Sequence, residues 1–164
     1  MTLVIREIAG SADDPELAGR RRDPLEVGSE EAPRRRLRGV TAGGIEVALD
    51  LPRGSFLSEG TVLHDDGEGI IVVERKPEPA LVVRLDPSLP TARLVEETSR
   101  VGHWAGNQHL LLETVGTEIR IRITAPAELM LRAIAPLGLT GAEVSIDRLR
   151  FARETAPTLG HGHD

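Results

Sequence analysis

The side chains with the clearest capacity for chemistry are five histidines, in a chain that contains no cysteine. The lack of thiols excludes disulfides, thiolate metal sites and cysteine nucleophiles. Any metal site must therefore be built from imidazole and carboxylate groups, which suit Ni²⁺ and also Cu²⁺ and Zn²⁺. The five candidates are His64, His103, His109, His161 and His163.

Two of the histidines stand close to the end of the chain. His161 and His163 are flanked by Gly160 and Gly162, with Asp164 beside them. This composition predicts a flexible tail carrying metal ligands. Because His-x-His is a short pattern, an incidental pair or a remnant of cloning is an open alternative.

A third candidate, His109, follows Gly106, Asn107 and Gln108 at the predicted junction of a helix and a strand. One imidazole is a poor metal site, but a two-fold dimer axis beside it would supply two at one point. Judged from the residue alone, His109 fits a buried histidine bonded to a backbone carbonyl better than a ligand.

The remaining histidines fit structural roles better than ligation. His64 precedes Asp65 and Asp66 and is predicted to lie in a solvated turn, and His103 lies where a cation favours the helix dipole. The chain contains no phosphate loop, dinucleotide-binding, zinc-protease or nucleophile-elbow motif, so we do not expect an enzyme.

The elements that position these residues fall into two parts. Residues 10–34 are predicted to be a long polar loop, and Lys76-Pro77-Glu78-Pro79 marks a domain boundary. Before that boundary no helix of ordinary length fits, and alternation of apolar residues predicts strands only. The predicted strands are residues 3–8, 37–40 and 45–49 as a hairpin, 61–63 and 70–73.

After the boundary the apolar period changes to that of mixed helices and strands. Thr124 is predicted to cap the second helix, whose buried stripe is Ala127, Met130, Leu131, Ile134 and Leu137, and Gly106-Asn107 to end the first. The expected order is strand 81–85, helix 90–105, strands 109–112 and 119–123, helix 126–137 and strand 143–147.

The order βαββαβ is that of a ferredoxin-like domain. The predicted fold class is therefore α+β, with a small all-β domain over residues 1–76, a ferredoxin-like domain over 77–150 and a disordered, histidine-containing tail over 151–164. Such a fold does not by itself decide a function.

Charge and hydropathy narrow the possible partners. The net charge is −6, and the arginine clusters at 20–22 and 34–38 lie among acidic residues, so we expect no nucleic-acid partner. No apolar run is long enough for a membrane helix, and the N-terminus lacks the features of a signal peptide. We therefore expect a cytoplasmic protein without a membrane partner.

Three stretches together resemble the urease accessory protein E family, the nickel metallochaperones of urease assembly. Gly106-Asn107-Gln108-His109 is similar to the family's Gly-Asn-Arg-His signature. Phe151 followed by Gly160-His161-Gly162-His163 resembles its C-terminal pattern. In the first half, Gly43 to Val47 and Leu51 to Leu63 follow the family's succession of strand, Arg-Gly, Leu, Gly and strand.

The resemblance implies a homodimer that carries Ni²⁺, with Zn²⁺ or Cu²⁺ as competitors. It makes His109 the interface ligand, given once by each subunit, and His161 and His163 the ligands that complete or feed the site. It also implies a partner-binding N-terminal domain, and delivery through the urease accessory GTPase (accessory protein G) to an apo-urease assembly complex. Since ligation needs neutral imidazole, nickel affinity should fall below about pH 6.5.

The sequence departs from the family pattern at several positions. Gln108 replaces the usual arginine, and Trp104 stands where a histidine is usual, with His103 shifted by one. Arg120, Arg122 and Thr124 stand where some relatives have further histidines, and the tail has only two, so we expect no second surface site and no large nickel store.

Two other classes of function stay open at this point. The first is a ferredoxin-like protein-interaction module of urease assembly without tight metal binding. The second is a metal-responsive or nucleic-acid-binding regulator that uses the arginine runs, against which stand the acidic net charge and the few aromatic residues.

Overall fold

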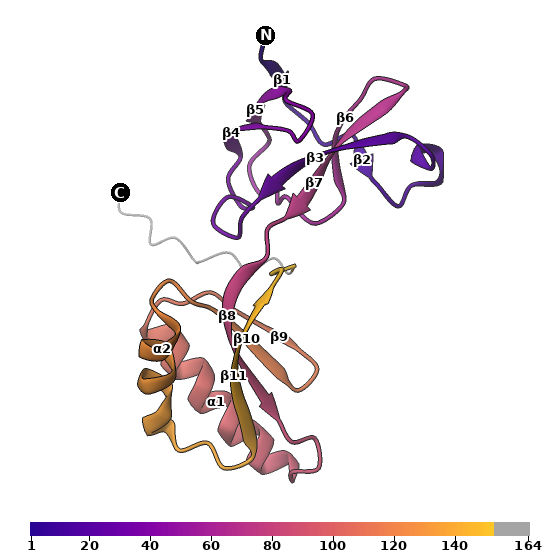
Figure 1. Ribbon diagram of the computed structural model, residues 1–164. Coiled ribbons are helices and arrows are strands. Elements are labelled where there is room, and N and C mark those ends of the chain that lie inside the picture. Colours follow the sequence, from indigo (N-terminus) through magenta and orange to yellow (C-terminus); the bar gives the residue numbers. More distant parts are fainter. Residues whose placement is uncertain (153–164) are drawn as a thin grey trace. The chain divides into compact units, whose positions relative to one another are not determined.

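The computed structural model of the protein describes residues 1–152. These residues form two compact units, residues 1–76 and 77–151 (Figure 1). The first is built from strands and the second from strands and two α-helices. The predicted α+β fold class is thereby confirmed.

The first unit consists of two small sheets. One has three strands in the order β1-β5-β4, and the other has four in the order β2-β6-β7-β3. The strands are β1 (Leu3–Ile5), β2 (Gly10–Ser11), β3 (Arg21–Val27), β4 (Arg36–Val40), β5 (Glu46–Asp50), β6 (Thr61–Asp65) and β7 (Gly69–Arg75), with a 3₁₀ turn η1 (Pro15–Leu17). The predicted hairpin is confirmed as the antiparallel pair β4–β5.

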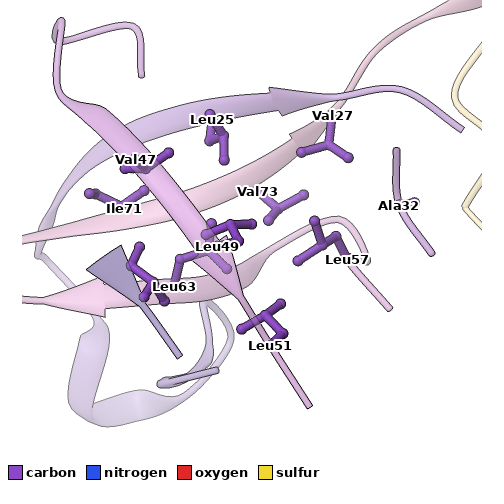
Figure 2. Close-up of a cluster of buried hydrophobic side chains, with 11 residues drawn as sticks. Leu25, Val27, Ala32, Val47, Leu49, Leu51, Leu57, Leu63, Ile71 and Val73 are labelled. Atoms are coloured by element: carbon purple, nitrogen blue, oxygen red, sulfur yellow. The ribbon is translucent and has the colours of Figure 1, made fainter. Parts of the chain in front are cut away.

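The core of this unit is formed by aliphatic side chains from both sheets (Figure 2). Val47 and Leu49 of β5 meet Leu25 of β3 and Ile71 and Val73 of β7 in this cluster. Alternate residues of β5 supply the contact, since alternate side chains of a strand share one face. The other alternation, Glu46, Ala48 and Asp50, lies on the outer face.

The prediction of a loop over residues 10–34 was wrong, because β3 lies inside it. β3 runs parallel to β7 and buries Leu25 and Val27, while Arg21, Arg22 and Glu26 remain exposed. A strand with so many charges gives a weak apolar signal. Pro24 is tolerated because β3 is the last strand of its sheet.

The second unit is a four-stranded antiparallel sheet in the order β11-β8-β10-β9, with both helices on one face (Figure 1). This is the ferredoxin-like arrangement, and that prediction is confirmed. The elements are β8 (Glu78–Leu85), α1 (Thr91–Asn107), β9 (Leu112–Val115), β10 (Glu118–Arg122), α2 (Ala127–Ile134), a 3₁₀ turn η2 (Ala135–Leu137) and β11 (Ala142–Leu149).

Helices and sheet share one aliphatic core. Leu81 and Val83 of β8 pack with Val101 and Ala105 of α1, and Met130 of α2 joins them. Two details differ from prediction. No side-chain cap, from Thr124 or elsewhere, begins α2, and Leu131 of its predicted buried stripe is exposed.

Within residues 1–152, neither helix combines the length and the hydropathy needed to cross a membrane.

Candidate metal centre

The backbone around His109 forms a defined helix end. Helix α1 ends at Asn107, Gln108 is its C-cap, and His109 has a φ of 54°, in the left-handed region. The N–H of His109 donates to the carbonyl of Gly106 (3.0 Å), and the N–H of Leu110 donates to that of Ala105 (3.0 Å). This pair of bonds is a Schellman motif, whose left-handed position is usually glycine.

His109 is the one non-glycine residue with positive φ in the part of the chain that the structure describes. Its side chain is exposed, so it is not the buried, carbonyl-bonded histidine that the residue alone suggested. A residue kept in a strained backbone conformation, with an exposed imidazole, is typical of a functional position. The predicted helix end at Gly106-Asn107 came too early, because His109 and not either of those residues is left-handed.

The two residues that follow His109 each pack against an apolar cluster and so fix the position of its backbone. Leu110 packs against the core under the helices, and Leu111 packs against a small cluster formed by Ala80, Val82 and Phe151. The N–H of Arg122 donates to the carbonyl of Leu111 (2.9 Å), which ties this segment to β10. The segment was predicted to be a strand from His109 onwards, but β9 begins only at Leu112.

Phe151 was predicted to belong to a flexible tail, and this was wrong. It is 1% exposed and packs on Ala80 and Val82 of β8. Sequence reasoning missed this anchor, although an aromatic residue just after the last strand was the available signal. The other two predicted ligands, His161 and His163, lie outside the described residues.

The two other histidines have local surroundings of their own. The amide nitrogen of Asn107 lies 3.0 Å from Nε2 of His103 on the exposed side of α1. His64 lies not in a turn, as predicted, but within β6, next to an irregularity of the β6–β7 pairing, and is half-buried. Residues 1–152 contain no group of three or more side chains that could together hold a metal.

Ion pairs occupy the positions where some relatives were expected to carry histidines. Arg120 bonds to Glu118 and to Glu113, and Arg122 bonds to Glu78. The hydrogen bond from Arg120 holds the pKa of Glu118 below its ordinary value. Guanidinium groups cannot ligate a metal, so these arginines add no donor to the imidazole of His109.

Comparison with known proteins identifies the group to which this chain belongs. Residues 5–76 match the family model described as the UreE urease accessory protein, N-terminal domain. The chain is 30% identical over 143 residues to a urease accessory protein UreE 1 of Pseudomonas syringae pv. syringae, covering 82% of this chain and 93% of that protein. The chain belongs to the UreE family.

Other UreE relatives extend the match. The UreE of a Nostoc species is 31% identical over 136 residues, covering 82% of this chain and 83% of the relative. That of Staphylococcus saprophyticus is 25% identical over 165 residues and covers 99% and 100%. All three relatives are named as urease accessory proteins, so a role as an accessory protein of urease follows for this UreE member.

Proposed function

We propose that this UreE family member is a nickel metallochaperone, not an enzyme, that acts in the cytoplasm as a homodimer. It receives Ni²⁺ at a site shared by the His109 of each subunit and completed by His161 and His163. It then passes the ion, through the urease accessory GTPase, into an apo-urease assembly complex. Zn²⁺ and Cu²⁺ compete for the same nitrogen donors.

The observation that carries this proposal is the exposure of the His109 side chain at a left-handed backbone position. Its imidazole is exposed at a backbone position where a glycine would be less strained. A single exposed imidazole becomes a useful metal site when a symmetric interface brings a second copy to it.

The anchor at Phe151 supports the role of the tail residues. Phe151 shares a cluster with Leu111, which follows His109 by two residues. His161 and His163 follow Phe151 by ten and twelve residues. A chain of ten residues spans at most about 35 Å, and a short tether gives a high effective concentration at nearby groups. Both tail imidazoles are therefore within reach of the proposed site.

This division of ligands suits both capture and release. Under the proposal, the His109 pair holds the ion on fixed backbone, and the tail donors can leave to open coordination positions for a receiving protein. Because each imidazole must lose its proton to bind metal, nickel affinity should fall as pH drops below about 6.5. A site that enclosed the ion with fixed ligands alone would release it slowly.

The test is native mass spectrometry during a Ni²⁺ titration of the full chain. The wild type is expected to be a dimer with one tight nickel for each pair of chains. His109→Ala should lose tight binding, and a chain stopped at Leu159 should bind more weakly. His103→Ala is the matched control, since His103 is also exposed near the end of α1 and should retain the wild-type affinity.

Nickel binding by His109→Ala that equals the wild type would overturn the proposal. It would favour instead an interaction module of urease assembly without tight metal binding. That second function also predicts that the chain stopped at Leu159 binds its partners as the full chain does.

A further inference from the structure

Strand β4 leaves one of its edges without a neighbouring strand. It is the last strand in the order β1-β5-β4 and pairs with β5 alone. The N–H of Leu51 donates to the carbonyl of Arg35, and the N–H of Thr41 donates to that of Ile45. These two backbone hydrogen bonds fix which residues of β4 face β5. Since facing alternates along an antiparallel pair, Arg36, Arg38 and Val40 point their N–H and C=O groups outward. From Arg36 to Val40 the described part of the molecule thus offers a row of outward backbone donors and acceptors. The row ends there, because the next outward N–H, that of Ala42, donates to the carbonyl of Pro24 in β3 (2.9 Å).

This open edge is basic although the chain as a whole is acidic. Arg36 and Arg38 are exposed on β4, and Arg34 and Arg35 are exposed just before it. Two carboxylates share this face: Asp50, which pairs with Arg36 at 2.9 Å and with Arg35 at 4.0 Å, and Glu46, which accepts a hydrogen bond from the hydroxyl of Thr2. With a net charge of −6 for the chain, four exposed arginines beside two carboxylates are a local reversal of sign.

The outer face beside this edge is hollowed and partly apolar. A shallow hollow of about 410 Å³ is bordered by Val4, Ala48, Arg36 and Arg38, among others. A second of about 320 Å³ adjoins it across Arg38 and includes Val40. Val4 and Val40 are more than half exposed, at 56% and 60%. These two valines place apolar side chains next to the arginines of the outer face.

We propose that β4 binds an extended acidic segment of a partner protein, which adds to the sheet as a further strand. Its backbone pairs with the outward groups of Arg36, Arg38 and Val40. Alternate carboxylates of the segment lie beside the two arginines on the outer face, because side chains of neighbouring strands stand about 5 Å apart. The intervening apolar residues lie on the other face, beside Leu37 and Gly39.

Gly39 adds a reason for apolar residues at that second face. A Cβ placed on Gly39 would lie 2.9 Å from Cδ1 of Leu25, so the inner side of β4 is closely covered by an aliphatic side chain of β3. Leu37 also packs against the core of this unit. An added strand would therefore lie beside the half-buried Leu37 on its inner side and beside the exposed Arg36 and Arg38 on its outer side. A partner segment that fits both sides has acidic and apolar residues in alternation.

Two simpler explanations of the arginines account for fewer of the features of this edge. Charges on an edge strand discourage aggregation, but this needs no hollowed apolar face beside them. A single-stranded nucleic acid would need aromatic side chains on which bases stack. The residues bordering the two hollows include no aromatic side chain. An acidic peptide segment uses the charge, the free backbone groups and the apolar surface at once.

The first test measures binding of a fluorescein-labelled synthetic peptide in which Glu and Val alternate. The full chain should bind it at physiological salt, and Arg36→Ser with Arg38→Ser should weaken binding at least about tenfold. Arg132→Ser with Arg148→Ser removes the same charge from the other unit and should leave binding unchanged. Control peptides have Lys in place of Glu, or the same composition without alternation.

The second test asks whether the peptide pairs as a strand. On peptide binding, exchange of the backbone amide hydrogens of Arg36, Arg38 and Val40 should slow at least about tenfold. Amides of Leu37 and Gly39, which already face β5, provide the internal control. Val40→Pro removes one outward N–H without changing charge, at an edge position where proline is tolerated, and should also weaken binding.

Several results would overturn the proposal. They are absence of saturable binding, equal binding of the Lys peptide or of the peptide without alternation, and unchanged exchange at the three outward amides. Binding of a single-stranded oligonucleotide with the same arginine dependence, in place of the peptide, would also overturn it. The inference is independent of nickel, since His109→Ala should bind the peptide like the wild type.

Discussion

At the scale of single residues, the cost of placing His109 where it stands is informative. The left-handed position of a Schellman motif is suited to glycine, because a Cβ clashes there with the backbone. The structure instead has an exposed histidine at φ 54°. Proteins often accept such local strain where a side chain has a task that stability alone would not select.

Two substitutions at residue 109 should differ in their effect on stability and agree in their effect on nickel binding. His109→Gly should raise the free energy of unfolding by about 1 kcal/mol relative to His109→Ala, because only glycine relieves the strain. Both variants should lose tight nickel. The fluorescence of Trp104, the only tryptophan of the chain, reports urea unfolding of the second unit alone. Equal stability of the two variants would show that the backbone at residue 109 carries no strain.

The sequence indicated His109 as a candidate but not its conformation. Its place in Gly106-Asn107-Gln108-His109 was readable from the chain. Gly106 and Asn107 are themselves good left-handed residues, so local preference put the helix end too early. The Schellman bonds also depend on where Leu110 is buried, which is decided by packing over distance and not by neighbours in sequence.

At the scale of elements, periodic segments were predictable and charged ones were not. The β4–β5 hairpin and both helices follow from apolar spacing that local sequence displays. Strand β3 does not, because its core contact rests on Leu25 and Val27 amid charged residues and a proline. It forms because β7 offers a parallel partner far along the chain. Pairing at such separation leaves little trace in a local pattern.

Phe151 gives an element-scale prediction, since it fastens the end of the β11 segment to β8. Phe151→Ala should lower the free energy of unfolding of the second unit by about 3 kcal/mol, the usual cost of removing a buried aromatic side chain. Phe151→Leu, which refills part of the volume, should cost much less. Urea unfolding followed by Trp104 fluorescence measures both. A loss for Phe151→Ala below about 0.5 kcal/mol would indicate that residue 151 is not anchored.

At the scale of the whole molecule, the two units carry separate tasks in our proposals. The first has its own core and the open basic edge of β4, and the second has its own core and His109. Each task can therefore be removed by substitution without touching the core of the other unit. The division also explains why motifs spread over most of the chain were needed to suggest the family from sequence, while each site is local.

Sharing of the nickel site between two chains makes a prediction about mixed dimers. When wild-type and ¹⁵N-labelled His109→Ala chains are unfolded together and refolded in equal amounts, random pairing gives about one quarter wild-type dimers and about one half mixed dimers. A site that needs His109 from both chains leaves tight nickel in the wild-type dimers only. Native mass spectrometry separates the three species by mass and counts nickel in each. Mixed dimers that hold nickel as tightly as wild-type dimers would mean that each chain carries its own site, because one His109 would then suffice.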